Sequence, residues 1–445
     1  MKKLSEIKSE LQKKYEAQIT KNNFVKGRTS LDNVKIIGTT GSRGKSTVTY
    51  LVHEYLKFKG KKSILYSSLG VDSPASFKGF APVEVPLYNE KTIFNIINEA
   101  EAYGTDYLVL EVNETAIDKG LADDLPFNVR ALTGIIPGHS LFYDHNYYIN
   151  LKKRFMRVND SSKLVFGLTR GTTKEMMEEL LNISSNEKIL FGLNYVINVR
   201  GFDSEMFDFV LTKEKNNGLS LEGLEMEINT KSERFALQSK LIMPFHLENI
   251  LCVLGILKAC DELDIDVFKD FLLNITVPGR EEVFKYKKRT IILSIDLLPQ
   301  LEELKKMHHN KLLVVAGAEG VDFKGFIKDF PEEIYYQEKT KAIKAAGAYM
   351  SKYADHVYLT SNSNANFEAH DFLKYQAEAL KGASHEIIIS REEAIKKAIA
   401  DANEGDIIFI SGRGNREKFL TSFTEMEIIK DLDLIEKSIY QEGDN

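Results

Sequence analysis

A glycine-rich stretch between a short apolar run and an amphipathic segment constrains this chain more than any other feature. Residues 38–47 read Gly-Thr-Thr-Gly-Ser-Arg-Gly-Lys-Ser-Thr. Residues 34–37 before them have the pattern of a buried strand, and residues 45–59 have the apolar spacing of a helix. Glycines let backbone N–H groups turn toward an anion, and the start of a helix adds positive potential. The pattern predicts a phosphate-binding loop at a strand–helix junction.

Within this loop, Lys45 and Ser46 carry the most specific expectations. The lysine ammonium neutralises phosphate charge, and the serine hydroxyl is a ligand for Mg²⁺. Thr39 stands where the strict pattern has a glycine, so a glycine-rich turn beside a lysine is the alternative interpretation. The residues that we expect to contact the nucleotide are Gly41, Ser42, Arg43, Gly44, Lys45, Ser46 and Thr47.

A second apolar run ends in an acidic residue. Residues 106–111 read Asp-Tyr-Leu-Val-Leu-Glu, which is typical of a buried strand with Glu111 at its carboxyl end. In open α/β sheets, ligands bind at that edge of the sheet, where the phosphate loop also emerges. Because hard cations prefer oxygen ligands, we expect Glu111 to bind a metal ion, although an acidic residue after a strand is commonly only structural.

Strand-like and helical segments alternate along most of the chain, which predicts parallel sheets covered by helices. The alternation breaks at residues 195–243, where apolar and polar residues alternate and antiparallel hairpins are expected. A helix is expected from Leu247 to Leu263, with Cys252 and Cys260 on its buried face. From residue 290 onward, a second series of apolar runs separated by helical segments indicates another α/β domain.

These patterns predict an α/β protein with a P-loop central domain, which holds a mostly parallel sheet, and a C-terminal Rossmann-like α/β domain. We expect an N-terminal helical segment over residues 1–30, an ATP-binding domain over residues 31–285 and the second domain over residues 286–445.

Composition excludes several classes of protein. The 445 residues carry a formal net charge of −6, and 43% of them are hydrophobic. These values argue against a disordered chain and against a nucleic-acid partner bound through bulk charge. No apolar stretch reaches about 18 residues, so we expect no membrane span. With two cysteines and no visible targeting segment, a cytoplasmic location is expected.

Further motifs follow the phosphate loop in a defined order. They are Glu111-Val112, His139, Lys152, Asn249, Pro278-Gly279-Arg280, and the segments 353–361, 390–395 and 405–414. Together with residues 38–47, this order resembles that of the Mur ligases, most of all the MurE type, and the resemblance covers about residues 34–420.

The resemblance implies an ATP-dependent ligase that makes an amide bond through an acyl phosphate. It implies two Mg²⁺ ions, one held by Ser46 and Glu111 and a second by His139 with a carbamylated lysine. Motif spacing selects Lys152 as that lysine and an ungapped count from His139 selects Lys153, while two solvated helix lysines are the alternative. The implied catalytic residues are Lys45, His139 and Lys152.

The nucleotide contacts implied by the resemblance are Asn249 at the adenine, with Arg280 and Asp296 from the domain junction. Two positions depart from the family pattern. Gly138 stands where the family usually has an aspartate before the histidine, and Ser294 stands at the position of another family aspartate. Asp296 would therefore have to act from two residues further on.

Substrate specificity departs from the family more clearly. MurE ligases use an Asp-Asn-Pro-Arg motif to bind the distal carboxylate of diaminopimelate, and this chain has Asn362-Ser363-Asn364-Ala365 instead. Without the arginine, diaminopimelate is disfavoured. Asn362, Asn364, Arg413 and Arg416 are the substrate candidates, with a solvated basic turn as the equal alternative for the two arginines.

The phosphate loop begins only 37 residues into the chain, so the family's N-terminal UDP-binding domain is expected to be absent. We therefore expect a non-standard small-molecule carboxylate as the acceptor, which the enzyme joins to an amino acid or another amine. Whether a partner protein takes part is an open alternative. One alternative is a ligase of the poly-γ-glutamate or folylpolyglutamate type. Another is a non-catalytic nucleotide-binding scaffold or regulatory protein.

Overall fold

The structure is a computed structural model that describes residues 31–73, 90–123, 125–136, 145–157, 160–215, 220–317, 319–320, 332–364, 369–420 and 426–443. The helix expected within residues 1–30 lies outside these ranges. Contacts divide the chain into two compact units: the first runs to Ile275, and the second comprises residues 276–445 with the short stretches Leu219–Glu222 and Leu241–Met243. Among the described residues, no helix has the length and apolar character needed to cross a bilayer.

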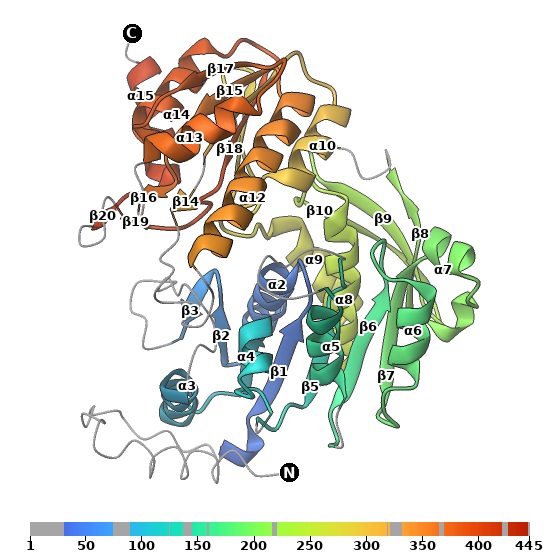
Figure 1. Cartoon of the computed structure of the whole chain (residues 1–445). Coiled ribbons are helices and arrows are strands. Elements are labelled where there is room, and N and C mark those ends of the chain that lie inside the picture. The colour runs from blue at the N-terminus through green and yellow to red at the C-terminus, as the bar shows by residue number, and fades with distance from the viewer. Residues whose placement is uncertain are drawn as a thin grey trace. The chain divides into compact units, whose positions relative to one another are not determined.

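The first unit is built on a 10-stranded sheet with the order β10-β9-β8-β7-β6-β5-β1-β4-β2-β3 (Figure 1). The strands from β8 to β2 in this order are parallel, and β3, β9 and β10 are antiparallel to their neighbours. The strands are β1 (Lys35–Thr40), β2 (Ser63–Ser67), β3 (Gly70–Asp72), β4 (Tyr107–Glu111), β5 (Val129–Leu132), β6 (Lys163–Leu168), β7 (Lys188–Leu193), β8 (Phe209–Glu214), β9 (Leu224–Asn229) and β10 (Arg234–Ser239).

Helices pack on this sheet, and α2 and α8 pack against each other on it. The helices are η1 (Leu31–Asn33), α2 (Lys45–Phe58), α3 (Glu90–Tyr103), α4 (Glu114–Asp118), α5 (His145–Met156), α6 (Lys174–Leu181), α7 (Asn194–Arg200), η2 (Ser204–Met206), α8 (Phe245–Ala259) and α9 (Ile265–Asn274). Nearly every residue of α8 is buried. Cys252 and Cys260 are both buried, as predicted.

The region from residue 195 to 243 is only partly the set of hairpins that its alternating pattern predicts. β8, β9 and β10 do form an antiparallel series. Residues 194–200, however, form α7, which ends at Gly201 in the left-handed conformation with a φ of 74°. Val196 and Ile197 are adjacent and both buried. In a strand with one exposed face, adjacent side chains point to opposite faces, so only one of the two would be buried.

The second unit contains a 6-stranded sheet with the order β11-β12-β18-β13-β15-β17. All neighbours are parallel except β11 and β12. The strands are β11 (Glu282–Tyr286), β12 (Arg289–Ser294), β13 (Leu312–Ala316), β15 (His356–Leu359), β17 (Ser384–Ile387) and β18 (Ile407–Ser411), with the small pairs β14 (Glu319–Gly320) with β16 (Ser363–Asn364) and β19 (Lys418–Leu420) with β20 (Met426–Ile428).

The helices of the second unit are α10 (Leu298–Lys306), α12 (Glu332–Tyr353), α13 (Ala369–Glu378), α14 (Arg391–Asp401) and α15 (Asp431–Gly443). Apolar side chains of β12, β13 and β18 form a core with those of α14 and α15. Both units thus have a mostly parallel sheet packed with helices, and the predicted α/β class is confirmed.

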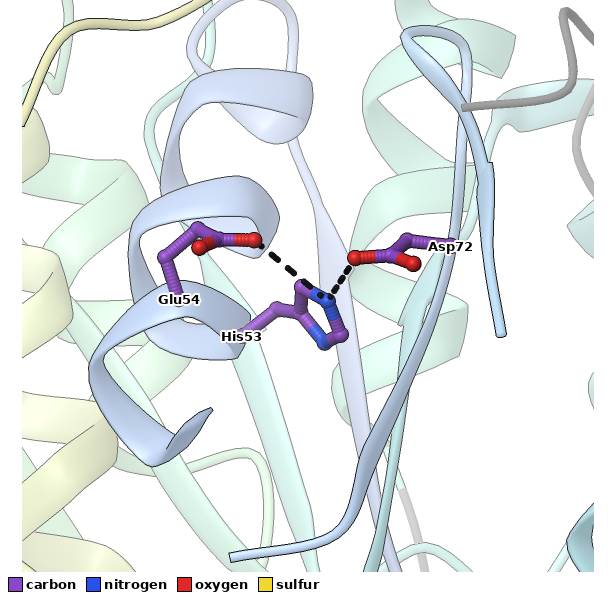
Figure 2. A group of neighbouring side chains, drawn as sticks. All are labelled: His53, Glu54 and Asp72. Carbon is purple, nitrogen blue, oxygen red and sulfur yellow. Dashed lines mark hydrogen bonds and ion pairs between the residues drawn. The ribbon is translucent and has the colours of Figure 1, made fainter. Parts of the chain in front are cut away.

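A polar cluster on α2 and β3 ties the helix to the edge of the first sheet (Figure 2). Nε2 of the fully buried His53 lies 3.0 Å from an Asp72 oxygen and 3.6 Å from a Glu54 oxygen. The ammonium of Lys57 donates to both carboxylates, at 2.7 and 3.0 Å. These His, Asp and Glu atoms converge closely enough to hold a metal ion. Because the Lys57 ammonium already donates to both carboxylates, we interpret the cluster as structural.

Candidate active site

The phosphate loop turns sharply between β1 and α2, and its glycines allow this. Gly41 and Gly44 have φ values of 146° and 81°. A Cβ at Gly41 would lie 2.1 Å from the Thr133 hydroxyl, and a Cβ at Gly44 would lie 2.1 Å from the side-chain oxygen of Asn249. Larger residues are therefore excluded by both conformation and space. The same contact brings Asn249, the expected adenine residue, directly against the loop.

Side chains around the loop fix its shape. The backbone N–H of Ile136 and the hydroxyl of Tyr148 both donate to the Ser42 hydroxyl, at 2.8 and 3.1 Å. The Thr133 hydroxyl donates to the carbonyl of Arg43. Ser42 is therefore buried and supports the loop, a role that its place in the motif did not predict.

Lys45 begins α2 and folds back over the loop. Its ammonium donates to the carbonyls of Gly41, at 3.1 Å, and Ser42, at 3.4 Å. Both acceptors are backbone groups of the loop itself, so the ammonium lies where the loop curves around an anion. A phosphate group bound there would compete with these carbonyls for the same donor.

A hydroxyl chain links the start of α2 to the end of β4. The hydroxyls of Ser46 and Ser68 are 2.7 Å apart. The Ser68 hydroxyl and backbone N–H donate to one oxygen of Glu111, at 3.1 and 2.9 Å. Since the Ser68 proton goes to the carboxylate, Ser46 donates to Ser68. Glu111 reaches this place because β4 lies beside β1 in parallel, with Thr39 opposite Glu111.

Lys152 and Lys153, the two candidates left open by motif spacing, point in different directions from α5. The Lys152 side chain is 0% exposed, and its ammonium donates to Glu114, at 3.0 Å, and to the hydroxyl of Thr40, at 3.2 Å. Lys153 pairs with Glu179, whose side chain is exposed. Of the two lysines, Lys152 is therefore the one beside the phosphate loop.

The pKa values of both Lys152 and Glu114 are lowered by their surroundings. Burial, together with the charge of Lys45, lowers the pKa of Lys152 to about 8, against the opposing effect of Glu114. Burial would raise the pKa of Glu114, but the charges of Lys152 and Lys45 hold it at about 2. Glu114 is therefore an anion at neutral pH. Neither Glu114 nor Ser68 belongs to a motif that the sequence pattern singled out.

The oxygen atoms around Ser46 are of the kind that binds a magnesium ion. The hydroxyls of Ser46 and Ser68 and the carboxylate of Glu111 form one hydrogen-bonded series, and hard cations take such neutral and anionic oxygens. His139 and Gly138, which belong to the expected second metal position, lie outside the described residues.

The nucleotide candidates of the second unit contact each other. One oxygen of Asp296 lies 2.6 Å from the guanidinium of Arg280. The Ser294 hydroxyl donates to Glu281 and accepts from the backbone N–H of Asp296. Ser294 thus supports the turn that carries Asp296. The roles of Arg280 and Asp296 toward ATP stay predictions.

Two of the substrate candidates belong to a buried network. The guanidinium of Arg413, 1% exposed, donates to the backbone carbonyls of Asn362, Arg416 and Ile429. The side chain of Asn362 accepts from Arg391 and donates to the carbonyl of Gly317. Both residues hold neighbouring loops together, and this geometry gives no support to a substrate contact.

The other two substrate candidates stay predictions. Arg416 is exposed, and Asn364 is the second residue of β16.

Comparison with known proteins agrees with this geometry. The family model described as the Mur ligase middle domain matches residues 39–257, and the model described as the Mur ligase, glutamate ligase domain matches residues 298–414. This chain belongs to the Mur ligase family. As a member of that family it is an ATP-dependent ligase that forms amide bonds.

Among its relatives is the UDP-N-acetylmuramoyl-L-alanyl-D-glutamate–2,6-diaminopimelate ligase of Caldanaerobacter subterraneus, 23% identical over 92% of this chain and 80% of the relative. The MurF ligase of Thermotoga maritima, solved in complex with ADP, shares the fold with a TM-score of 0.61 and 16% identity, over 99% of this chain and 84% of that one. Folylpolyglutamate synthase of the same organism gives a TM-score of 0.57 and 16% identity, over 93% and 90%.

Proposed function

We propose that this Mur ligase activates a small carboxylic acid with ATP at the loop of residues 41–47 and joins it to an amino acid or another amine. The observation that carries the proposal is the series Ser46–Ser68–Glu111, which lies beside Lys45 at the carboxyl edge of a parallel sheet. Such an edge is where open α/β sheets bind nucleotides.

In the first step, a carboxylate oxygen attacks the γ-phosphorus and the bond to the β,γ-bridging oxygen breaks, which gives an acyl phosphate and ADP. In the second step, the amine nitrogen attacks the carbonyl carbon and loses a proton, and the carbon–oxygen bond to phosphate breaks. Negative charge accumulates on the phosphoryl oxygens in the first step. Lys45 and the backbone N–H groups at the start of α2 would stabilise that charge.

Ser46, Ser68 and Glu111 would hold one Mg²⁺, which would neutralise phosphate charge when bound. A second Mg²⁺ is expected toward His139 and Lys152 and needs an anionic oxygen. A carbamate on Lys152 is one source of that oxygen. The carboxylate of Glu114, which lies beside Lys152, is another.

The amine differs from that of the diaminopimelate ligases in our proposal. Residues 362–365 lack the arginine that would bind a distal carboxylate, so diaminopimelate is disfavoured as the amine. A glutamate-adding ligase of the folylpolyglutamate type is the second candidate. It is favoured by the neighbour of that name, of which this chain covers 90%.

Hydroxylamine trapping tests the acyl phosphate without knowledge of the amine. The protein is incubated with ATP, Mg²⁺, hydroxylamine and a panel of carboxylic acids that includes pteroyl and γ-glutamyl acids, and hydroxamate and ADP are measured together. We expect one class of acid to give equal amounts of both. ATP binding without hydroxamate or ADP from any acid or any amine would favour a non-catalytic nucleotide-binding protein instead.

A further inference from the structure

Asn249 lies near the start of α8 and turns the oxygen of its side-chain amide toward the phosphate loop. A Cβ on Gly44 would lie 2.1 Å from this oxygen, so the oxygen rests against the glycine that precedes α2. Among the described residues, no hydrogen-bond donor reaches the oxygen, and it is not one of the fully buried unpaired atoms. The amide therefore offers an unused acceptor at the edge of the loop.

His246 holds the other end of the same amide. Its Nδ1 lies 3.2 Å from the side-chain nitrogen of Asn249, three residues further along α8, and the His246 side chain is buried. Residues three apart on a helix are neighbours on its surface. Because an amide nitrogen only donates, Nδ1 accepts and the proton of the ring lies on Nε2. The contact thus keeps the nitrogen at His246 and turns the oxygen toward Gly44.

The start of α8 is itself held in place. The backbone N–H of Arg170 donates to the Glu248 carboxylate at 2.7 Å, and the Arg170 guanidinium donates to the carbonyl of Pro244 at 3.3 Å. The rings of Phe245 and His246 are in contact, with centroids 4.7 Å apart. Since α8 also packs against α2, the amide is fixed beside the loop before any ligand arrives.

An unused acceptor beside a nucleotide site favours a ligand that brings a donor. Adenine carries an exocyclic amino group, which donates. Hypoxanthine has the same ring system with a carbonyl oxygen at that position, which only accepts. An oxygen that faces the amide oxygen forms no hydrogen bond and leaves two acceptors unpaired, which costs binding energy. The orientation of the amide therefore distinguishes the two bases.

We propose that His246 is a positioning residue for base selection: it holds the nitrogen of the Asn249 amide, so that the oxygen accepts a hydrogen bond from the exocyclic amino group of adenine and disfavours a 6-oxopurine. The inference rests on the proposed function, since it assumes that a nucleotide binds at the phosphate loop. His246 acts through Asn249 and does not itself contact the nucleotide.

Calorimetric titration of the full chain with ADP, IDP and pyrophosphate, each with Mg²⁺, tests the inference without turnover. The wild type should bind ADP at least about tenfold more tightly than IDP. His246→Leu should lose this preference and keep its affinity for pyrophosphate, because the loop itself is unchanged. His246→Asn should keep the preference, since an amide oxygen takes the place of Nδ1. Lys258→Met, near the other end of α8, should bind all three ligands like the wild type.

Equal binding of ADP and IDP by the wild type, or tighter binding of IDP, would overturn the inference and leave the proposed function intact. An unchanged preference in His246→Leu, or an equal loss of all three ligands, would also overturn it. If His246→Leu does not fold, the ¹⁵N spectrum of histidine-labelled wild type decides, with the His246 signal assigned through His246→Asn: a ring protonated on Nδ1 contradicts the inference. A wild type that binds none of the three ligands would overturn the proposed function as well.

Discussion

Lys152 in the first unit and Arg413 in the second are equally hidden from solvent, yet their surroundings differ. Lys152 donates to a hydroxyl and a carboxylate beside the phosphate loop. Arg413 donates to three backbone carbonyls and lies 3.5 Å from Asp431. Arg413 is itself buried, so the loss of these hydrogen bonds would leave polar groups unpaired inside the fold. Burial of a charged side chain therefore does not by itself identify a functional site. The groups that the side chain contacts distinguish a functional charge from a structural one.

Arg391, near Arg413, is a second buried cation with a structural role. Its guanidinium makes a two-pronged contact with Asp431, at 2.7 and 2.6 Å, and also donates to Asn362 and to the carbonyl of Ser411. Asp431 begins α15 and is fully buried. The cluster thus fastens the last helix to the end of β18 and to the loop after β15.

The largest expected effect is on the catalytic side. Lys45→Ala should lower the rate of ADP formation by about a thousandfold or more, because it removes the charge that faces the developing phosphoryl anion. Its melting temperature should stay close to that of the wild type, since the hydrogen bonds that it loses go to two carbonyls of the loop, those of Gly41 and Ser42. Retained turnover would refute the phosphate-loop assignment.

Arg391→Met should lower the stability of the fold, whereas Lys45→Ala should lower only the activity. It leaves the Asp431 carboxylate buried with only the more distant Arg413, and breaking a buried ion pair in this way costs about 3–5 kcal/mol. Hydrogen exchange in α14 and α15 should measure the loss. The matched control is Lys437→Met, which breaks the surface pair of the same two helices with Glu392 and should cost about 0–1 kcal/mol. Equal losses in both variants would remove the contrast between the two regions.

Lys152→Met and Lys153→Met distinguish the roles of two adjacent lysines on α5. Lys152→Met should lower turnover by about a hundredfold, because Glu114 loses the group that holds it at the phosphate site. Added formate or acetate distinguishes the two possible sources of the anionic oxygen, since only a lost carbamate can be replaced from solution. Lys153→Met should be close to the wild type, because its partner Glu179 is exposed. Rescue of Lys152→Met by short carboxylates would instead favour a carbamate.

The phosphate loop, Glu111 and the strands of the second unit were predictable because each is a local pattern. Ser68 was within reach of the same reasoning: β2 is parallel to β4, so the residue after its end arrives at the same edge as Glu111. Glu114 was not, since its pairing with Lys152 depends on how α4 packs against α5. Nothing in the sequence near Arg413 shows that backbone carbonyls surround it, because two of the three belong to other loops, at Asn362 and Ile429.

The smallest expected effect concerns the His53–Asp72 cluster, which lies on the same helix as Lys45 and is nevertheless structural. Hydrogen bonding to His53, with further help from Lys57, overcomes the effect of burial and lowers the pKa of Asp72 to about 2. A lowered pKa stabilises the fold above the ordinary aspartate value of about 4, and this stability is lost as the pH falls toward 2. Asp72→Asn should therefore cost about 1–2 kcal/mol at neutral pH.

The pH dependence distinguishes this role from a metal site. Denaturant midpoints of the wild type should fall between about pH 4 and pH 2, and those of Asp72→Asn should fall less, because the variant has no carboxylate to protonate. Added Zn²⁺ or Mn²⁺ should change neither midpoint at neutral pH, since Lys57 already occupies both carboxylates. A metal-dependent rise in the wild-type midpoint that Asp72→Asn abolishes would mean that this cluster, like Glu111, exchanges its partners and belongs with the functional residues.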